Sequence, residues 1–118
     1  MINVIEIIGT GYVGLVTGVC FADKGYNVIC YDKERSIINN LRKGQCHFFE
    51  KNLGRYLKKA ILKKKINFEI LSQSTKFKSN LIFITVGTPF NNGKIDLRNI
   101  TNVSKIIGKN IKNTNKFV

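Results

Sequence analysis

The sequence predicts an α/β fold with a doubly wound parallel sheet, and two observations support this prediction. Apolar runs rich in β-branched residues alternate with segments of helical period along the chain. The first run leads into three closely spaced glycines, followed by a helical segment and a second apolar run. Strand, helix and strand within about thirty residues form the βαβ unit of a parallel sheet. The alternation continues along the chain, so helices are expected on both faces of the sheet.

The N-terminal part contains the clearest elements. Residues 2–8, INVIEII, are expected to form a buried parallel strand because β-branched residues dominate the run. The helix after the glycines begins near residue 12 and stops at Lys24 and Gly25. Residues 27–32, NVICYD, form the second strand. The apolar face of the helix, at helical spacing, comprises Val13, Val16, Val19 and Cys20.

The middle of the chain continues the alternation. A helix over residues 33–44 is closed by its terminal glycine, and a second helix covers roughly residues 51–64. Strand-like runs occupy residues 66–70 and 80–87, with a short helical or irregular turn between them.

The C-terminal part adds a loop, GTPFNNGKID, and a helix from about Leu97 to Asn110. Residues 116–118, KFV, resemble a fifth strand cut off as it begins. We therefore expect about five strands in the order 3-2-1-4-5. Residues 1–118 form a single domain with no linker or internal repeat.

Composition narrows the class of protein. With 118 residues, 43% of them hydrophobic, the chain is a globular domain with a real core. No apolar run approaches the roughly 18 residues of a membrane helix, and the N-terminus lacks the pattern of a signal peptide. We therefore expect a cytoplasmic protein without a membrane partner. The three cysteines, Cys20, Cys30 and Cys46, are too far apart for a CxxC motif and are expected to be buried, reduced thiols.

The net charge of +13 raises nucleic acid as a partner. The lysines are spread along the chain, however, and the densest group lies in residues 57–65, LKKAILKKK. Apolar residues are threaded through that group at helical spacing, namely Leu57, Ala60, Ile61 and Leu62. This pattern is typical of an amphipathic helix with a solvated basic face, so no dedicated nucleic-acid site is expected.

The glycines between the first strand and the first helix follow the pattern G-x-G-x-x-G. In a Rossmann-type dinucleotide site, Gly9 permits the tight turn and Gly11 lets the backbone approach the pyrophosphate. Gly14 allows the helix to pack close to the sheet. Gly18, one turn later, also indicates close packing, because a glycine inside a helix is otherwise unfavourable. The phosphates then lie at the positive N-terminus of the helix.

Asp32 ends the second strand eighteen residues after Gly14. A carboxylate there can accept hydrogen bonds from both hydroxyls of an adenosine ribose and repels a 2′-phosphate, which favours NAD over NADP. The competing interpretation is a glycine-rich turn with an unrelated aspartate at a strand end.

Three segments together resemble the NAD-binding domain of the UDP-glucose/GDP-mannose dehydrogenase family, most closely its members that oxidise UDP-glucose. They are IGTGYVGLVTGVCFADKGYNVICYDK, GQCHFFEKNL and IFITVGTPF, in the family's order and spacing. The resemblance implies a four-electron oxidation of a nucleotide sugar, such as UDP-glucose to UDP-glucuronate, with two NAD molecules reduced. In the family a cysteine captures the aldehyde intermediate covalently.

The resemblance also implies site residues. Tyr12 and Val13 match residues that line the cofactor, and Thr88 matches a threonine at the end of the fourth strand that contacts the dinucleotide. Pro89 would fix the turn after Thr88. The expected cofactor-binding set is Gly9, Thr10, Gly11, Tyr12, Val13, Gly14, Asp32, Lys33 and Thr88.

The sequence departs from the family pattern at several positions. Ile37 replaces a common lysine, so a ribose or phosphate contact is lost unless Lys33 or Arg35 supplies it. The family's E-P-G-L turn reads E-K-N-L at residues 50–53, and His47 replaces a proline and is expected at the surface. No metal ligand set accompanies this histidine.

The family's catalytic cysteine, its partners and most of the sugar pocket match nothing in this sequence, so no catalytic residue is assigned. The UDP-sugar, and a homodimer, are expected only of a longer enzyme. Two alternatives stay open: a non-catalytic nucleotide-binding module, and the same domain of a GDP-mannose or UDP-N-acetyl-hexosamine dehydrogenase.

Overall fold

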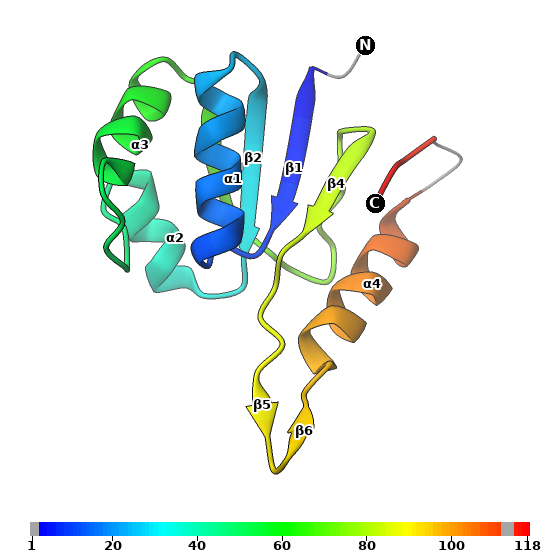
Figure 1. The fold of residues 1–118 in the computed structure, drawn as a ribbon. Coiled ribbons are helices and arrows are strands. Elements are labelled where there is room, and N and C mark those ends of the chain that lie inside the picture. The colour runs from blue at the N-terminus through cyan, green and yellow to red at the C-terminus, as the bar shows by residue number, and fades with distance from the viewer. Residues whose placement is uncertain (1–2, 112–114) are drawn as a thin grey trace.

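The computed structural model describes residues 3–111 and 115–118 and shows a three-layered α/β arrangement (Figure 1). Four parallel strands form the central sheet in the order β3-β2-β1-β4. Their bounds are β1 Val4–Ile8, β2 Asn27–Asp32, β3 Ile66–Ile70 and β4 Leu81–Ile84. The doubly wound parallel sheet predicted from the sequence is confirmed.

Helices cover both faces of this sheet. Three of them, α1 Tyr12–Asp23, α2 Arg35–Arg42 and α3 Leu53–Leu62, pack on one face. The fourth, α4 Arg98–Asn110, packs on the other face. Beyond β4, Phe117 forms a parallel bridge with Leu81, and its backbone exchanges hydrogen bonds with Asn80 and Ile82. This bridge occupies the position predicted for a fifth strand.

Helix α1 turns a different face toward the sheet than the valine spacing predicts. Its buried residues are Gly14, Leu15, Gly18, Val19 and Ala22. Val13 is 62% exposed and Cys20 is also exposed, so the predicted apolar face is wrong at these two positions. The reason is steric, because the glycine side of the helix lies closest to the strands. A Cβ at Gly18 would lie 2.9 Å from Cys30 Sγ and 3.2 Å from Ile7 Cδ1.

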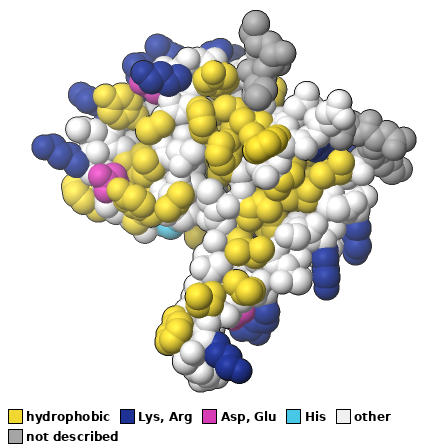
Figure 2. Space-filling model, turned by 45° about the vertical axis from the view of Figure 1, so that its right-hand side comes forward, with side chains coloured by type: hydrophobic (Ala, Val, Ile, Leu, Met, Phe, Trp, Pro, Cys, Tyr) yellow, Lys and Arg dark blue, Asp and Glu magenta, His cyan; other side chains and the backbone are white. Residues whose placement is uncertain are grey.

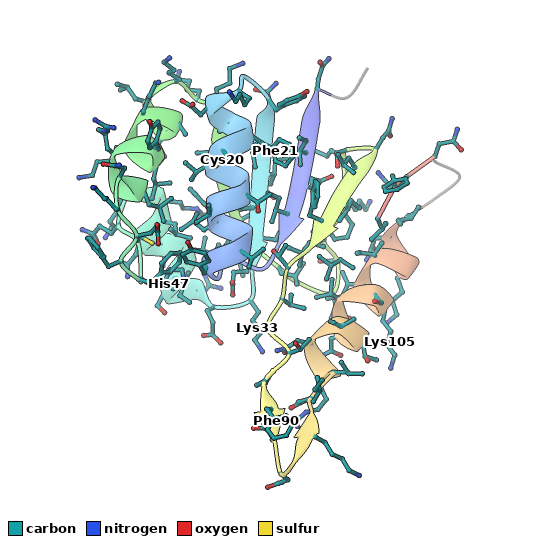
Figure 3. All side chains as sticks on the ribbon, viewed as in Figure 1. Cys20, Phe21, Lys33, His47, Phe90 and Lys105 are labelled. Atoms are coloured by element: carbon teal, nitrogen blue, oxygen red, sulfur yellow. The ribbon has the colours of Figure 1, made fainter. Side chains whose placement is uncertain are left out.

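The cysteines and the basic helix also require corrections. Cys30 is buried and Cys46 is half-buried, but Cys20 lies exposed on α1 (Figure 3). In α3, Leu57 and Ala60 are buried as expected, whereas Leu62 is 84% exposed. Lysine and arginine side chains are scattered over the face shown in Figure 2 and form no single patch there. Within the described residues, no helix is long and apolar enough to cross a membrane.

A buried carboxylate lies inside the apolar run of β1. Glu6 is fully buried and accepts hydrogen bonds from the Tyr31 hydroxyl at 2.5 Å and from the backbone N–H groups of Lys78 and Ser79 at 2.7 and 2.6 Å. Burial, followed by hydrogen bonding to Glu6, raises the pKa of Tyr31. These bonds tie the segment before β4 to the centre of the sheet.

A short hairpin, which the sequence analysis treated as loop, projects from the body as an arm. It consists of β5 Phe90–Asn91 and β6 Lys94–Ile95, paired antiparallel. Asp96 fixes its base: its N–H donates to the Pro89 carbonyl at 2.7 Å, and its carboxylate accepts from Arg98, which lowers the pKa of Asp96. Hydrophobic side chains lie along this arm (Figures 2 and 3), and Phe90 is 71% exposed.

The E-K-N-L turn keeps a glycine-like backbone. Asn52, the N-cap of α3, has φ 68° and ψ −8°, which lies in the left-handed region. Asparagine is one of the few residues other than glycine that adopt this region routinely. The departure from the family's sequence is therefore compatible with a positive φ at the start of α3.

We predict that Gly18→Ala destabilises the fold, although alanine is intrinsically better than glycine in a helix by about 1 kcal/mol. The added methyl meets the Cys30 sulfur inside a packed core, where overpacking costs about 1–3 kcal/mol. Cys30→Ala removes that sulfur, so the double variant should be more stable than the sum of the two single changes. Urea unfolding of the four proteins measures this coupling. If the losses of stability from the two single changes simply add in the double variant, Gly18 of α1 does not pack against Cys30 of β2.

We also predict that Asn52→Gly raises the free energy of unfolding by up to about 1 kcal/mol, because glycine adopts a positive φ without steric cost. Asn52→Val should lower it, because a β-branched residue is strained there. Thermal unfolding of both variants tests the turn. Equal effects of glycine and valine would contradict its left-handed conformation.

Candidate functional site

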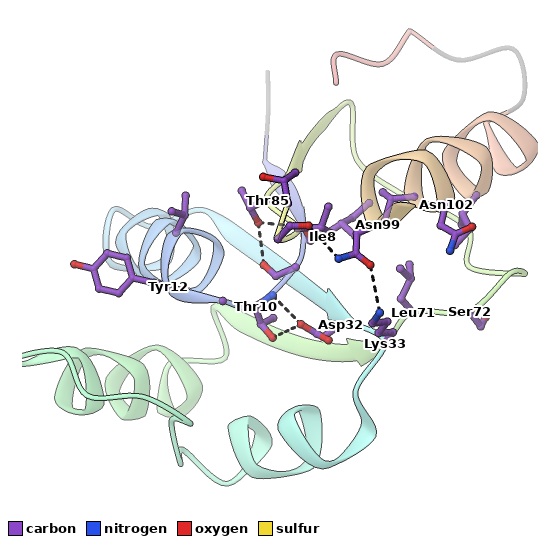
Figure 4. Close-up of a pocket in the computed structure, with 18 of the residues that line it drawn as sticks. Ile8, Thr10, Tyr12, Asp32, Lys33, Leu71, Ser72, Thr85, Asn99 and Asn102 are labelled. Carbon is purple, nitrogen blue, oxygen red and sulfur yellow. Dashed lines mark hydrogen bonds between the residues drawn. The ribbon is translucent and has the colours of Figure 1, made fainter. Parts of the chain in front are cut away.

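A cavity of about 650 Å³ opens at the carboxyl ends of the parallel strands. It lies between the β1–α1 loop, the end of β2, the segments after β3 and β4, and the first turns of α4 (Figure 4). The strand order reverses here, since β2 and β4 lie on opposite sides of β1. Open parallel sheets bind ligands at this position, and the volume suits a small molecule.

The loop between β1 and α1 is held by contacts that only glycine permits. Gly9 has φ 104°, and a Cβ there would lie 2.7 Å from the Thr85 carbonyl oxygen. A Cβ at Gly14 would lie 1.9 Å from the Gly9 carbonyl oxygen and 2.4 Å from Thr85 Oγ1. The Thr85 hydroxyl donates to the carbonyls of Gly9 at 2.9 Å and Ile8 at 3.1 Å. The loop, the helix and the end of β4 therefore pack as one unit.

The N-terminus of α1 is open toward the cavity. Gly11 is the N-cap, no side chain caps the helix, and the first turn holds no acidic residue. The Leu15 N–H donates to the Gly11 carbonyl at 3.0 Å, so the earlier N–H groups of the helix lack intrahelical acceptors. A Cβ at Gly11 would meet no atom within 4 Å. Free N–H groups and the helix dipole make this a binding position for an anion such as a phosphate.

Asp32 lies at the end of β2, beside the β1–α1 loop, and is tied to that loop through Thr10. Asp32 Oδ2 accepts the Thr10 N–H at 2.9 Å and the Thr10 hydroxyl at 2.7 Å. Asp32 Oδ1 accepts the Glu34 N–H at 3.0 Å, at the start of α2. The carboxylate therefore has a fixed orientation at the end of β2.

Lys33, the next residue, extends from the end of β2 toward α4 and also lines the cavity. Its ammonium donates to Asn99 Oδ1 at 3.3 Å, and the Asn99 amide donates to the Gly87 carbonyl at 3.0 Å (Figure 4). Ile37, by contrast, packs against the core. Of the two basic residues considered in place of a lysine at position 37, Lys33 lines the cavity and Arg35 does not.

Tyr12 and Val13 lie at the rim of the cavity and are 54% and 62% exposed. The Tyr12 ring packs 5.7 Å from the Phe48 ring, and its hydroxyl points away from Asp32 (Figure 4). Hydrogen bonding with the Glu50 carboxylate raises the pKa of Tyr12. These two residues thus border the cavity without pointing polar side-chain atoms into it.

The structure brings most of the predicted site residues together. Those that line the cavity are Gly9, Thr10, Gly11, Tyr12, Val13, Asp32, Lys33 and Thr88. Gly14 is buried behind the loop and acts through packing. The prediction that Thr88 ends the fourth strand is wrong: β4 ends at Ile84, so the residue at that position is Thr85, and Thr88 is exposed at the rim.

Two groups of lining residues were not predicted from the sequence. The first follows β3 and β4 and includes Leu71, Ser72, Thr85 and Val86. The second lies on α4 and comprises Asn99, Asn102, Val103 and Ile106. The spacing of the second group, i, i+3, i+4 and i+7, is that of one helix face and could have indicated a shared surface.

The cavity lining contains no cysteine or histidine. Burial raises the pKa of Cys30 to about 12, which makes its thiol a poor nucleophile at neutral pH. His47 is exposed, as expected, and its ring contacts Phe48 edge to face. In residues 3–111 and 115–118, no cluster of three potential metal ligands occurs.

The chain is similar to proteins of one family. The model of the UDP-glucose/GDP-mannose dehydrogenase family, NAD binding domain, matches residues 3–118. The UDP-glucose 6-dehydrogenase of Rhizobium meliloti is 38% identical over 110 residues, which cover 92% of this chain and 25% of that protein. UDP-glucose 6-dehydrogenase YwqF of Bacillus subtilis is 39% identical over 109 residues, 92% of this chain and 25% of that protein.

Solved structures show the same fold. A UDP-glucose dehydrogenase from Pyrobaculum islandicum superposes with a TM-score of 0.85 at 32% identity, covering 93% of this chain and 26% of that one. A GDP-mannose dehydrogenase from Pseudomonas aeruginosa gives a TM-score of 0.86 at 31% identity, with coverages of 93% and 26%. The chain therefore spans about a quarter of the length of these relatives.

We predict that alanine has opposite consequences at two glycines of the loop. Gly14→Ala should lower the free energy of unfolding by about 2 kcal/mol or more, because its Cβ overlaps the Gly9 carbonyl. Gly11→Ala should change it by less than about 0.5 kcal/mol, because the space there is open. Urea unfolding compares the two, and similar losses would contradict the packing of the loop.

Proposed function

The chain belongs to the UDP-glucose/GDP-mannose dehydrogenase family as its NAD-binding domain, and on this basis we propose that it holds NAD for the oxidation of UDP-glucose to UDP-glucuronate. The observation that carries the proposal is the cavity, which joins an open helix N-terminus to the Asp32 carboxylate. Relatives named UDP-glucose 6-dehydrogenase at 38% and 39% identity support this choice of substrate.

The residues of the cavity fit a dinucleotide. The pyrophosphate would lie against the N–H groups at the start of α1, where Gly11 leaves room for it. The adenosine ribose would lie at Asp32, which lines the cavity and accepts three hydrogen bonds out of the about four that a carboxylate can accept. The negative charge of Asp32 would repel a 2′-phosphate, which favours NAD over NADP.

The chemistry itself would come from the bound NAD, which accepts a hydride from the sugar. The chain's own residues would bind and orient. The α1 N-terminus neutralises the pyrophosphate, Asp32 fixes the ribose, and Lys33 adds a positive charge at the same end. Thr85 and the glycines keep the loop in place. Thr88, in the segment after β4, would contact the dinucleotide at the rim of the cavity.

We assign no catalytic residue to these 118 residues. The cavity is lined by no cysteine, and Cys20 and Cys46 lie outside it. In our proposal the covalent and sugar-binding steps belong to a longer enzyme, of which this chain is the cofactor domain. Oxidation of GDP-mannose is the second candidate function. The fold of this chain matches the GDP-mannose dehydrogenase of Pseudomonas aeruginosa as well as it matches the UDP-glucose dehydrogenase of Pyrobaculum islandicum.

The cofactor site is tested by calorimetric titration of the 118-residue protein with NAD. We expect saturable binding of one NAD, weakened about tenfold by Gly11→Ala because the methyl occupies the pyrophosphate's space. Gly54→Ala is the matched control, since that glycine also has open space around it but lies on α3 outside the cavity. Equal effects of the two substitutions, or no saturable binding, would contradict the proposed site.

The substrate is tested by NADH formation. We expect none from the 118-residue protein with NAD and UDP-glucose, because no cysteine lines its cavity to capture an aldehyde intermediate covalently. A protein made from a longer reading frame that includes these residues should reduce NAD faster with UDP-glucose than with GDP-mannose. Turnover by the 118 residues alone, or the reverse preference, would refute the respective part of the proposal.

A further inference from the structure

Thr10 connects the glycine loop to the carboxylate at the end of β2. Its side chain is fully buried, and both its N–H and its hydroxyl donate to Asp32 Oδ2, at 2.9 and 2.7 Å. We propose that Thr10 is a positioning residue that orients Asp32 and thereby sets the selectivity for NAD over NADP. This inference rests on the proposed placement of the ribose at Asp32.

The number of acceptor positions on Asp32 supports the inference. A carboxylate offers about four lone-pair positions, two on each oxygen. Thr10 occupies both positions of Oδ2, and the Glu34 N–H occupies one position of Oδ1. One position on Oδ1 is left for a ligand. In this orientation Asp32 therefore accepts one ribose hydroxyl, instead of the two that the sequence analysis expects.

Burial separates the role of Thr10 from direct contact with the ligand. The Thr10 side chain has no exposed surface, so a bound dinucleotide meets the loop backbone and not the hydroxyl. Its hydroxyl donates to a charged acceptor, and hydrogen bonds of this kind are shorter and stronger than neutral ones. Thr10 acts on the cofactor through the orientation of Asp32.

The neighbouring positive charge makes this orientation matter for selectivity. Lys33 follows Asp32 in the chain, and its ammonium is held over the cavity by Asn99. A carboxylate fixed at the ribose position repels a 2′-phosphate, whereas the lysine attracts one. If Asp32 turns away, the lysine is left to favour NADP.

The test uses Thr10→Val, which keeps the branched shape but lacks the hydroxyl, with Thr10→Ser as the matched control that keeps it. We expect Thr10→Val to weaken NAD binding about tenfold and to lower the ratio of the NADP to the NAD dissociation constant by at least about fivefold. In Thr10→Ser, the NAD dissociation constant and the NADP-to-NAD ratio should both stay within about twofold of the values of the unsubstituted protein. An unchanged ratio in Thr10→Val, or a ratio equally lowered in Thr10→Ser, would overturn the inference.

A measurement without ligand separates this inference from the proposed function. Thr10→Val should lower the urea midpoint in the unsubstituted protein but have little effect in an Asp32→Ala background, where the acceptor is gone. Equal losses in the two backgrounds would show that Thr10 does not hold Asp32. Absence of NAD binding by the unsubstituted protein would instead refute the proposed function, and with it the role of Thr10 in selectivity.

Discussion

The contact between helix α1 and the loop before it determines the shape of the site. Gly14 lies so close to the Gly9 carbonyl that a single methyl group has no room between them. Because the helix starts this close to the sheet, its first N–H groups lie at the ends of β1 and β4, beside the cavity. Thr85 joins the same contact from β4 through its hydroxyl. The open end of α1 takes its position from this packing, and the Asp32 carboxylate is joined to the same loop through Thr10.

Charge then decides what the cavity attracts. The chain carries a net charge of +13, and the first turn of α1 holds no acidic residue to cancel the helix dipole. Among the residues that line the cavity, Asp32 carries the negative charge. Its carboxylate is stabilised by three hydrogen bonds that it accepts from Thr10 and Glu34. An anionic pyrophosphate at one end and a neutral, hydroxyl-bearing ribose at the other match this distribution. In our proposal, the same pattern would disfavour a second phosphate at the ribose.

Much of the fold could be predicted from the sequence, because hydrophobic period and glycine spacing are local signals. The strands at 27–32 and 66–70 are found at their predicted bounds, and the glycine loop and Asp32 meet as expected. The missed features depend on contacts distant in sequence. The buried Glu6 is stabilised by Tyr31 and by N–H groups more than seventy residues away, which no local pattern reveals. Likewise, the packing face of α1 follows from its distance to the sheet rather than from its valines.

We propose that the β1–α1 loop, Asp32 and α4 form one NAD site. The most direct measurement is a titration of isotopically labelled protein with NAD, followed by amide chemical shifts in NMR spectra. We expect saturable shifts concentrated in residues 9–13, 32–33 and 85–88 and in the first turns of α4, and little change among the lysines of α3. Shifts centred on α3 that vanish with added salt would show non-specific binding of an anion to basic side chains and would contradict the account.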